Sequence, residues 1–423
     1  MAIENKNIEK QLAEADAVAS SDPKRAEVIY RDVLKEPASE QADALRLQEA
    51  ALVKLGELYR DQKNAKGLAE VITLSRSYMS TTAKAKTAKL IRTLLDFFNP
   101  IPGSAQVQID VLRENIDWAK REKRIFQKQN LETRLVGIYL DTNQFKPALS
   151  LIESLLTELK RLDDKMVLTE VHLLESRVYR GVSNLAKSKA ALTSARTAAN
   201  AIYCPPHLQA ALDLQSGILH AEDKDYNTAY SYFFETFESL SAQDDNGALD
   251  ALKYMLLCKI MMNASEDANA LLQHKSAVKW AQLRDVESMR AIARAHQARD
   301  LAAFEQTLRD YRELSADPTV RSHLAALYDT LLEQNLLRIV EPYSVVEIEH
   351  VARRVGQGRQ SVEAKLSQMI LDRLLHGVLD QGRGCLLLFE EPRNDATYDA
   401  AIRTLEEVSK VVDSLYAKSE KIA

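Results

Sequence analysis

The chain has 423 residues, of which 46% are hydrophobic and 28% charged, and its formal net charge is −5 at pH 7. This length accommodates two or three domains with packed cores. Non-specific affinity for nucleic acid requires clustered lysine and arginine, so the slight acidity favours protein partners over polyanions. Few aromatic residues, 12 glycines and 10 prolines are typical of a mostly helical protein with little loop.

Targeting and catalytic signals are missing from the sequence. Residues 1–9 lack the apolar core of a signal peptide, and no stretch approaches about 18 consecutive apolar residues, so we expect a soluble intracellular chain with no membrane partner. The isolated Cys204, Cys258 and Cys385 encode neither a disulfide framework nor a metal cluster. The histidines include no i, i+4 pair, and no phosphate loop or nucleophile elbow is present. We therefore expect no enzyme activity, catalytic residue, metal or cofactor.

A repeat of about forty residues organises the first three hundred. Tyr59, Tyr139 and Tyr179 are separated by 80 and 40 residues, and His220 follows after 41 more. Mostly small side chains stand three residues before these anchors, as a close helix crossing requires: Gly56, Val136, Ser176 and Gly217. Polar turn residues follow them at 63–64, 142–143, 183–184 and 223–225. Each unit is therefore predicted to be a helical hairpin, and we interpret the anchors as core residues.

The anchor expected near residue 99 is missing from the repeat. A longer loop at 97–103 replaces it, where proline and glycine break the helix. Two further hairpins, with turns at 263–265 and 299–300, extend the array to about residue 318. Stacked hairpins share one core and curve into a superhelix with a concave face. The pattern is similar to tetratricopeptide repeats but has a longer period.

The pattern changes after about residue 318, where a winged helix is predicted. We expect a helix at 324–337, a short strand at 338–340 that stops at Pro342, and a helix capped by Ser344. The apolar face of that helix is Ile348, Val351, Ala352 and Val355. The next helix repeats apolar residues at Val362, Leu366, Met369, Ile370 and Leu374. A hairpin over 376–389, with its loop at 381–384, completes the predicted domain.

Charge argues against DNA as the partner of this winged helix. Between residues 338 and 391, seven basic residues face eight acidic ones, a net of −1. The basic residues are 338, 353, 354, 359, 365, 373 and 383, and the acidic ones are 341, 347, 349, 363, 372, 380, 390 and 391. The outward positions of the helix that would read a major groove mix Gln360, Glu363, Lys365, Gln368 and Asp372. A nucleic-acid-binding winged helix stays only as an alternative.

Two C-terminal segments are predicted to contact other proteins. The wing strand 385–389 is apolar throughout, and a sheet of three short strands leaves an open edge that another chain can pair with. The last helix has a heptad seam: Ala401, Leu405, Val408, Val412, Leu415, Ser419 and Ile422. Little of the chain is left to cover this seam, so we expect partner helices to do so. The predicted interface residues are Cys385, Leu387, Phe389, Leu405, Val408, Val412 and Leu415.

Several stretches resemble a known family. These are residues 331–342, 363–372, 376–382 and 408–416, and further upstream 190–206, 214–218 and 252–260. They are similar to the PCI-domain subunits of the 26S proteasome lid, and the resemblance spans about residue 85 to the end. It implies a mostly α fold, in which a right-handed superhelix of TPR-like hairpins precedes a winged helix and a C-terminal helix.

The resemblance implies three regions: a solenoid at 1–318, whose part from about 220 forms the helical half of the PCI domain, a winged-helix half at 319–392, and a bundle helix at 393–423. It implies a non-catalytic scaffold in ubiquitin-dependent degradation, located in cytoplasm and nucleus, that clamps the lid to the rest of the proteasome. The implied partners are other PCI lid subunits, the lid deubiquitinase module, the ATPase ring and the core-particle α ring. A PCI subunit of the COP9 signalosome is the alternative within the class.

Overall fold

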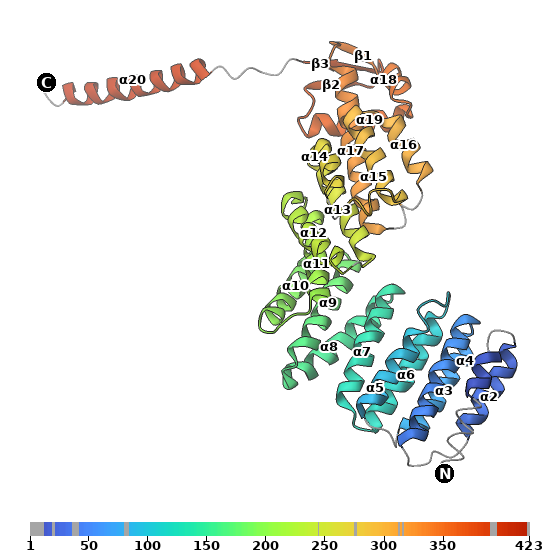
Figure 1. The fold of residues 1–423 in the computed structure, drawn as a ribbon. Coiled ribbons are helices and arrows are strands. Elements are labelled where there is room, and N and C mark those ends of the chain that lie inside the picture. The colour runs from blue at the N-terminus through green and yellow to red at the C-terminus, as the bar shows by residue number, and fades with distance from the viewer. Residues whose placement is uncertain are drawn as a thin grey trace. The chain divides into compact units, whose positions relative to one another are not determined.

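A computed structural model of the chain describes residues 12–18, 22–35, 42–79, 84–243, 245–274, 277–311, 314, 317–389 and 396–420. These residues form helices and one small sheet, so the predicted mostly α class is confirmed (Figure 1). The chain divides into two compact units, Met1–Ala251 and Leu252–Ala423.

The first unit is a succession of helices joined by short turns. They are a helix at 12–18, α2 (Pro23–Lys35), α3 (Ala42–Asp61), α4 (Ala65–Met79), α5 (Lys84–Asp96), α6 (Ala105–Arg121), α7 (Ile125–Asp141), α8 (Phe145–Leu162), α9 (Lys165–Gly181), α10 (Leu185–Asn200), α11 (Pro206–Glu222) and α12 (Tyr226–Ser241). Besides its neighbours in sequence, α3 contacts α5, α7 contacts α9, and α9 contacts α11. The even-numbered α4 likewise contacts α6, so helices that are two apart in the chain pack against each other in these parts of the array.

Each hairpin turn closes through the same backbone arrangement. Lys63, Asn143, Ser183 and Lys224 all adopt positive φ, between 55° and 66°. The amide of the following residue donates to the carbonyl of the predicted anchor, with N to O distances of 2.9 Å for Tyr59, 2.8 Å for Tyr139, 2.9 Å for Tyr179 and 3.0 Å for His220. This bond satisfies a carbonyl at the helix C-terminus, as in Schellman-type caps. The predicted hairpins are confirmed.

Left-handed residues recur every twenty residues in the middle of the unit, at Gly103, Lys123, Asn143, Asp163 and Ser183. Two helices of this length make one forty-residue repeat, which is the period seen in the sequence. The predicted break at 97–103 is also confirmed, because α5 ends at Asp96 and the chain turns through 97–104 before α6 begins. The turns at Lys123 and Asp163 were not among those predicted.

The anchors and the positions around them pack as expected, with two exceptions. Tyr59 and Tyr139 are buried, whereas Tyr179 and His220 are only partly buried. The positions nine residues after the anchors are completely buried: Leu68, Ala148, Ser188 and Ala229. The small residues before the anchors are needed for close contact. A Cβ atom added to Gly217 would lie 2.6 Å from the ring of buried Phe233.

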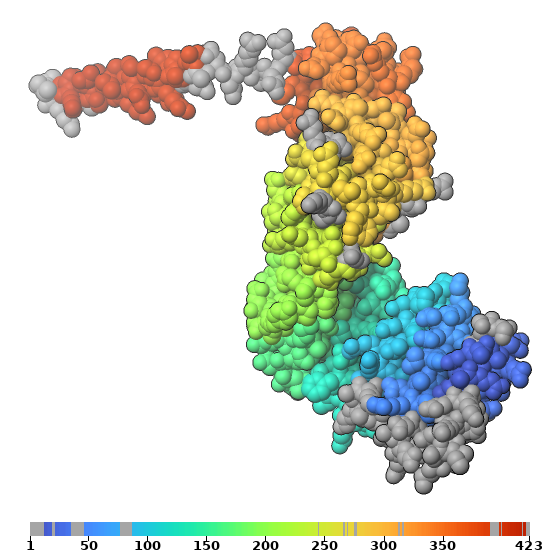
Figure 2. Space-filling view, viewed as in Figure 1, coloured from blue at the N-terminus to red at the C-terminus, as the bar shows by residue number. Residues whose placement is uncertain are grey.

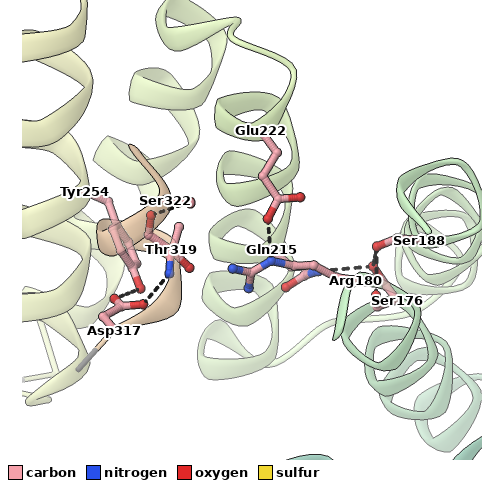
Figure 3. A network of polar contacts seen from close by, with 9 residues as sticks. All are labelled: Ser176, Arg180, Ser188, Gln215, Glu222, Tyr254, Asp317, Thr319 and Ser322. Atoms are coloured by element: carbon pink, nitrogen blue, oxygen red, sulfur yellow. Dashed lines mark hydrogen bonds and ion pairs between the residues drawn. The ribbon is translucent and has the colours of Figure 1, made fainter. Parts of the chain in front are cut away.

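Polar bonds also join successive hairpins in this unit. The Arg180 guanidinium on α9 donates to Glu222 on α11 at 2.7 Å, and Gln215 on α11 donates to the Ser176 hydroxyl on α9 at 3.3 Å (Figure 3). The Ser188 hydroxyl on α10 donates to the Ser176 carbonyl at 2.7 Å. Because these groups lie in or beside the shared core, they fix the register of neighbouring hairpins.

The second unit contains the small sheet. Its elements are α13 (Gly247–Met261), which begins in the first unit, α14 (Ser265–Leu272), α15 (Arg284–Ala298), α16 (Leu301–Asp310), α17 (Pro318–Val340), β1 (Val345–Glu347), α18 (Ile348–Val355), α19 (Arg359–Leu371), β2 (Gly377–Asp380), β3 (Cys385–Leu388) and α20 (Ala396–Glu420). The predicted turns near 263 and 299 have left-handed residues, Asn263 and Arg299. Asp317 caps α17 through the Thr319 amide at 2.9 Å and accepts a hydrogen bond from Tyr254 (Figure 3).

The sheet is antiparallel in the order β1-β3-β2, with Leu386 opposite Val346 on one side and Leu379 on the other. Leu386 is completely buried. The inward residues of α18 and α19 are at most 1% exposed: Ile348, Val351, Val362 and Leu366. The order of elements from α17 to β3 is that of the predicted winged helix.

Three details of that prediction are wrong. Residues 338–340 continue α17, and the first strand is β1. Pro342 therefore marks the end of a helix and not the end of a strand. Ser344 does not cap α18. Its carbonyl accepts the Leu388 amide at 2.9 Å, so it belongs to the sheet, and Glu347 occupies the N-cap position. Leu374 lies beyond the end of α19 and is exposed, and the buried residue there is Leu375.

The glycine contacts give a direct test of the close crossings. Gly217→Ala is expected to destabilise the chain by about 1–3 kcal/mol, because Phe233 has to move out of a packed position. Gly137→Ala on α7 is the matched control. No atom lies within 4 Å of the position that a Cβ atom at residue 137 would take, so alanine should stabilise that helix by about 0.5–1 kcal/mol. Urea unfolding followed by circular dichroism measures both. Equal midpoints for the two variants would contradict the close packing at Gly217.

Candidate protein-interaction surfaces

The α20 helix presents an uncovered apolar stripe. Every side chain described for this helix is exposed (red in Figure 2). The predicted seam residues Leu405, Val408, Val412 and Leu415 have exposed fractions of 69, 53, 57 and 59%. Ala401 and Ser419 are exposed as well, and Ile422 lies outside the described residues. An amphipathic helix whose described side chains are all exposed offers its apolar face to a partner.

The stripe is wider than the predicted seam. Four more exposed apolar residues flank it: Tyr398, Ile402, Val411 and Tyr416. At 3.6 residues per turn, the complete set covers roughly half of the circumference of the helix. A two-stranded coiled coil needs only a narrow seam, whereas a half-circumference stripe suits a helix that contacts at least two others. The flanking residues follow the seam at i+3, i+4 and i+7 spacing, so the sequence contained this signal.

The three predicted interface residues of the wing are in or directly after β3. β3 is the central strand, so Cys385 and Leu387 are paired on both sides and are half-buried. The open edges of the sheet belong to β1 and β2, where Val345 and Val378 are exposed. Phe389 follows β3 and is exposed, although its amide donates to the His376 carbonyl at 2.8 Å.

Phe389 belongs to an apolar patch that sequence reasoning did not find. It lines a cleft together with Tyr343 and Leu374, and both of these are also exposed. Leu371, at the end of α19, is exposed nearby in the sequence. The signal in the sequence was weak because these residues come from three separate segments. Contiguous exposed apolar residues of this kind mark interaction sites in soluble proteins.

The polar residues of α19 are used within the domain. Lys365 forms a 2.8 Å ion pair with Glu333 on α17, and little of its side chain is exposed. Glu363 accepts a hydrogen bond from Gln381 in the wing loop at 2.8 Å. A helix that reads DNA directs its donors outward to bases and phosphates. Lys365, the one lysine of α19, instead points toward its own domain, so its predicted outward position is wrong.

Metal-binding clusters and membrane-spanning helices are absent among the described residues. They include no group of three or more His, Cys, Asp or Glu side chains that could hold a metal ion. Burial raises the pKa of the Cys258 thiol to about 12, so this cysteine is protonated and a poor nucleophile. Within the described ranges, no helix combines the length and apolar composition that crossing a bilayer requires.

Three family profiles match separate parts of the chain. The profile of the 26S proteasome regulatory subunit RPN6 N-terminal domain matches residues 8–142, which extends the similarity toward the N-terminus. The PCI domain profile matches residues 308–390, and so includes α17 to β3. The profile of the 26S proteasome subunit RPN6 C-terminal helix domain matches residues 394–419, which are almost the bounds of α20.

Curated proteins are similar over nearly the whole chain. The "Probable 26S proteasome regulatory subunit rpn6" of Schizosaccharomyces pombe is 50% identical, over 95% of this chain and 95% of its own. The "26S proteasome non-ATPase regulatory subunit 11 homolog" of Arabidopsis thaliana is 47% identical, over 93% and 94%. The "26S proteasome regulatory subunit RPN6" of Saccharomyces cerevisiae is 46% identical, over 93% and 94%.

The electrostatics of α19 predict a null result with DNA. In a mobility-shift titration at low salt, the full chain should give no duplex complex at concentrations below about 1 µM. Weak non-specific binding has dissociation constants above that value. The variant Glu363→Lys with Asp372→Lys adds positive charge to this helix and to its C-cap, and serves as the comparison. A salt-sensitive submicromolar shift with the unmodified chain would overturn the assignment of this domain to protein partners.

Proposed function

Because the chain belongs to the Rpn6 family of 26S proteasome regulatory subunits, we propose that it is a non-catalytic scaffold of the lid that assembles through α20 and the winged helix. The observation that carries this proposal is the uncovered apolar stripe of α20. A stripe of this width is costly in water and is stabilised when other helices cover it.

The energy available from the stripe is sufficient for assembly. Each large apolar side chain that becomes fully buried contributes about 1.5–3 kcal/mol. Leu405, Val408, Val412 and Leu415 form the centre of the stripe and are the residues we propose for the contact. Because the stripe spans about half of the helix, we propose that α20 joins a bundle of helices from several lid subunits.

The winged helix supplies a second proposed contact. Its edge strands β1 and β2 can accept a strand from a neighbouring PCI subunit by β-augmentation. Phe389 and the cleft beside it offer an apolar anchor next to that edge. Cys385 and Leu387, which we also propose as interface residues, contribute through the half-buried faces of the central strand.

The helical array is the third element of the proposal. We propose a solenoid at 1–318, with residues from about 220 forming the helical half of the PCI domain, a winged-helix half at 319–392 and a bundle helix at 393–423. The array bridges the lid to the ATPase ring and the core-particle α ring. Repeated hairpins with shared cores and bonds such as Arg180 to Glu222 make it stiff enough to transmit a contact.

The remaining assignments follow from membership of the regulatory particle. We propose other PCI lid subunits and the deubiquitinase module as neighbours, and cytoplasm and nucleus as the location. Two findings argue against a signalosome subunit: the match to the C-terminal helix profile, and the three relatives described above, each of which is named as a proteasome subunit. The ion pair of Lys365 with Glu333 within the domain argues against a nucleic-acid-binding protein.

Charge placed in the stripe should block incorporation without unfolding the chain. Leu405→Asp with Val412→Asp is expected to leave the free energy of unfolding unchanged within about 0.5 kcal/mol, since both side chains are exposed in the free chain. Incorporation into the lid, measured by copurification from cells, should be lost. Arg403→Asp with Lys410→Asp places two aspartates at the same spacing on the polar face and should incorporate normally, although it changes the net charge by −4 and the stripe pair changes it by only −2. If both pairs behave alike, the stripe is not the contact.

A cavity in the middle of the array should act at a distance. Tyr139→Ala with Phe145→Ala is expected to destabilise the first unit by on the order of 5 kcal/mol. Native gels of cell extracts should then show free lid accumulating at the expense of whole proteasome. Phe126→Ala removes an exposed ring from α7 and is the control. Disintegration of the lid itself, or normal proteasome levels despite a destabilised chain, would contradict the bridging role.

A further inference from the structure

One border of the α20 stripe is acidic. Glu406 and Asp413 are exposed and lie seven residues apart, which is nearly two full turns of an α-helix. Both therefore stand on the same side of the helix, about 80–100° around its axis from Leu405 in the stripe. In the sequence, the same spacing leads to further acidic residues at 399 and 420. Glu406 and Asp413 together form what we call the acidic border.

The opposite border of the stripe is uncharged over the same turns. Thr404 and Val411 are exposed, are also seven residues apart, and lie about 100–120° from Leu405 in the other direction. The basic residues Arg403 and Lys410 are on the back of the helix, about 140–160° from Leu405. A helix that packs on the Val411 side therefore meets an uncharged surface, whereas one that packs on the other side meets two carboxylates.

The carboxylates of the acidic border have no partner in the described part of the chain. Neither forms an ion pair or a hydrogen bond there, although Lys410 lies between them in the sequence. A helix that covers the stripe removes water from these carboxylates, which is unfavourable unless a cation replaces it. Charges beside an apolar seam also select the partner in helix assemblies. A second copy of α20 packed through the same border would place like charges opposite each other, so a basic partner fits better.

We infer that the partner helix that packs on the acidic border of α20 carries lysine or arginine residues at seven-residue spacing, opposite Glu406 and Asp413. This inference rests on the proposed function, because it names the chemistry of one of the helices that cover the stripe. Residues seven apart are separated by about 10.5 Å along a helix axis. Because this separation is the same on both helices, the charges match in a parallel or an antiparallel arrangement. The helix on the Val411 side requires no such charge.

Binding of two designed peptides to the full chain tests the inference. Both peptides are amphipathic helices of the same length as α20 with the same leucine seam. They differ only at the positions beside that seam, which are lysine in one peptide and glutamate in the other. Fluorescence anisotropy at low salt measures both dissociation constants. The lysine peptide should bind about tenfold more tightly, since attractive pairs replace repulsive ones at two positions. Raising the salt concentration should reduce this ratio by screening.

Two charge variants locate the preference on the helix. Glu406→Lys with Asp413→Lys should reverse it, so that the glutamate peptide binds more tightly. Glu407→Lys with Ser414→Lys is the matched control, because it places two lysines at the same spacing on the back of the helix. The control raises the net charge by 3 and the first variant raises it by 4. The control should keep the preference for the lysine peptide. In cells, copurification with the lid should fall for the first variant and stay normal for the control.

The outcomes separate this inference from the proposed function. Equal binding of the two peptides, tighter binding of the glutamate peptide, an unchanged preference in the first variant, or its normal incorporation would each overturn the inference and leave the stripe contact standing. Self-association of the free chain through this border, seen by sedimentation and lost in the first variant, would make a second copy the occupant and also overturn it. Leu405→Asp with Val412→Asp should abolish binding of both peptides. If both still bind to that variant, the stripe is not the contact, and the inference falls with the proposed function.

Discussion

The helical array depends on how each of its helices ends. A helix leaves carbonyl groups unpaired at its C-terminus, and a tight turn into the next helix exposes amides at that N-terminus. One left-handed residue at each turn directs the next amide back to an anchor carbonyl, which pairs one of these carbonyl groups. The left-handed residues are Lys63, Asn143, Ser183 and Lys224. The following residue often pairs one of the exposed amides. Asn184, for example, accepts a hydrogen bond from the Lys187 amide at 3.2 Å. Without this arrangement the hairpins would need longer loops, and their helices would not share a core.

Sequence reasoning identified the elements whose signals are local and repeated. The period, the anchors, the small residues before them and the break at 97–103 are all set by steric rules within a few residues, and the structure has them. Tyr179 and His220 are less buried than the period suggested, because burial depends on which helix lies opposite and not on spacing alone. Residues 338–340 were misassigned because three apolar and basic residues before a proline fit a short strand as well as the last turn of a helix. Only the helix before them, which already buries Leu336, decides between the two.

The interaction surfaces also differ in whether their signals in the sequence are local. The seam of α20 is visible in the sequence because it is periodic and lies on one helix. The Phe389 patch gathers residues from three segments, so no window of sequence contains it. Strand order is also a tertiary property. The apolar run 385–388 suggested a strand that needs cover, and the cover it has is one strand on each side. Its neighbours, and not β3 itself, therefore carry the free edges.

The exposed stripe of α20 also has a consequence for the subunit before it reaches its complex. A copy released from the ribosome displays several large apolar side chains to water on a single helix, and such surfaces drive self-association and chaperone capture. The free chain is therefore prone to self-association for as long as this stripe stays uncovered. Cellular quality control recognises exposed apolar surface, so a free copy displays on α20 itself the feature that separates an uncovered chain from one whose stripe is covered.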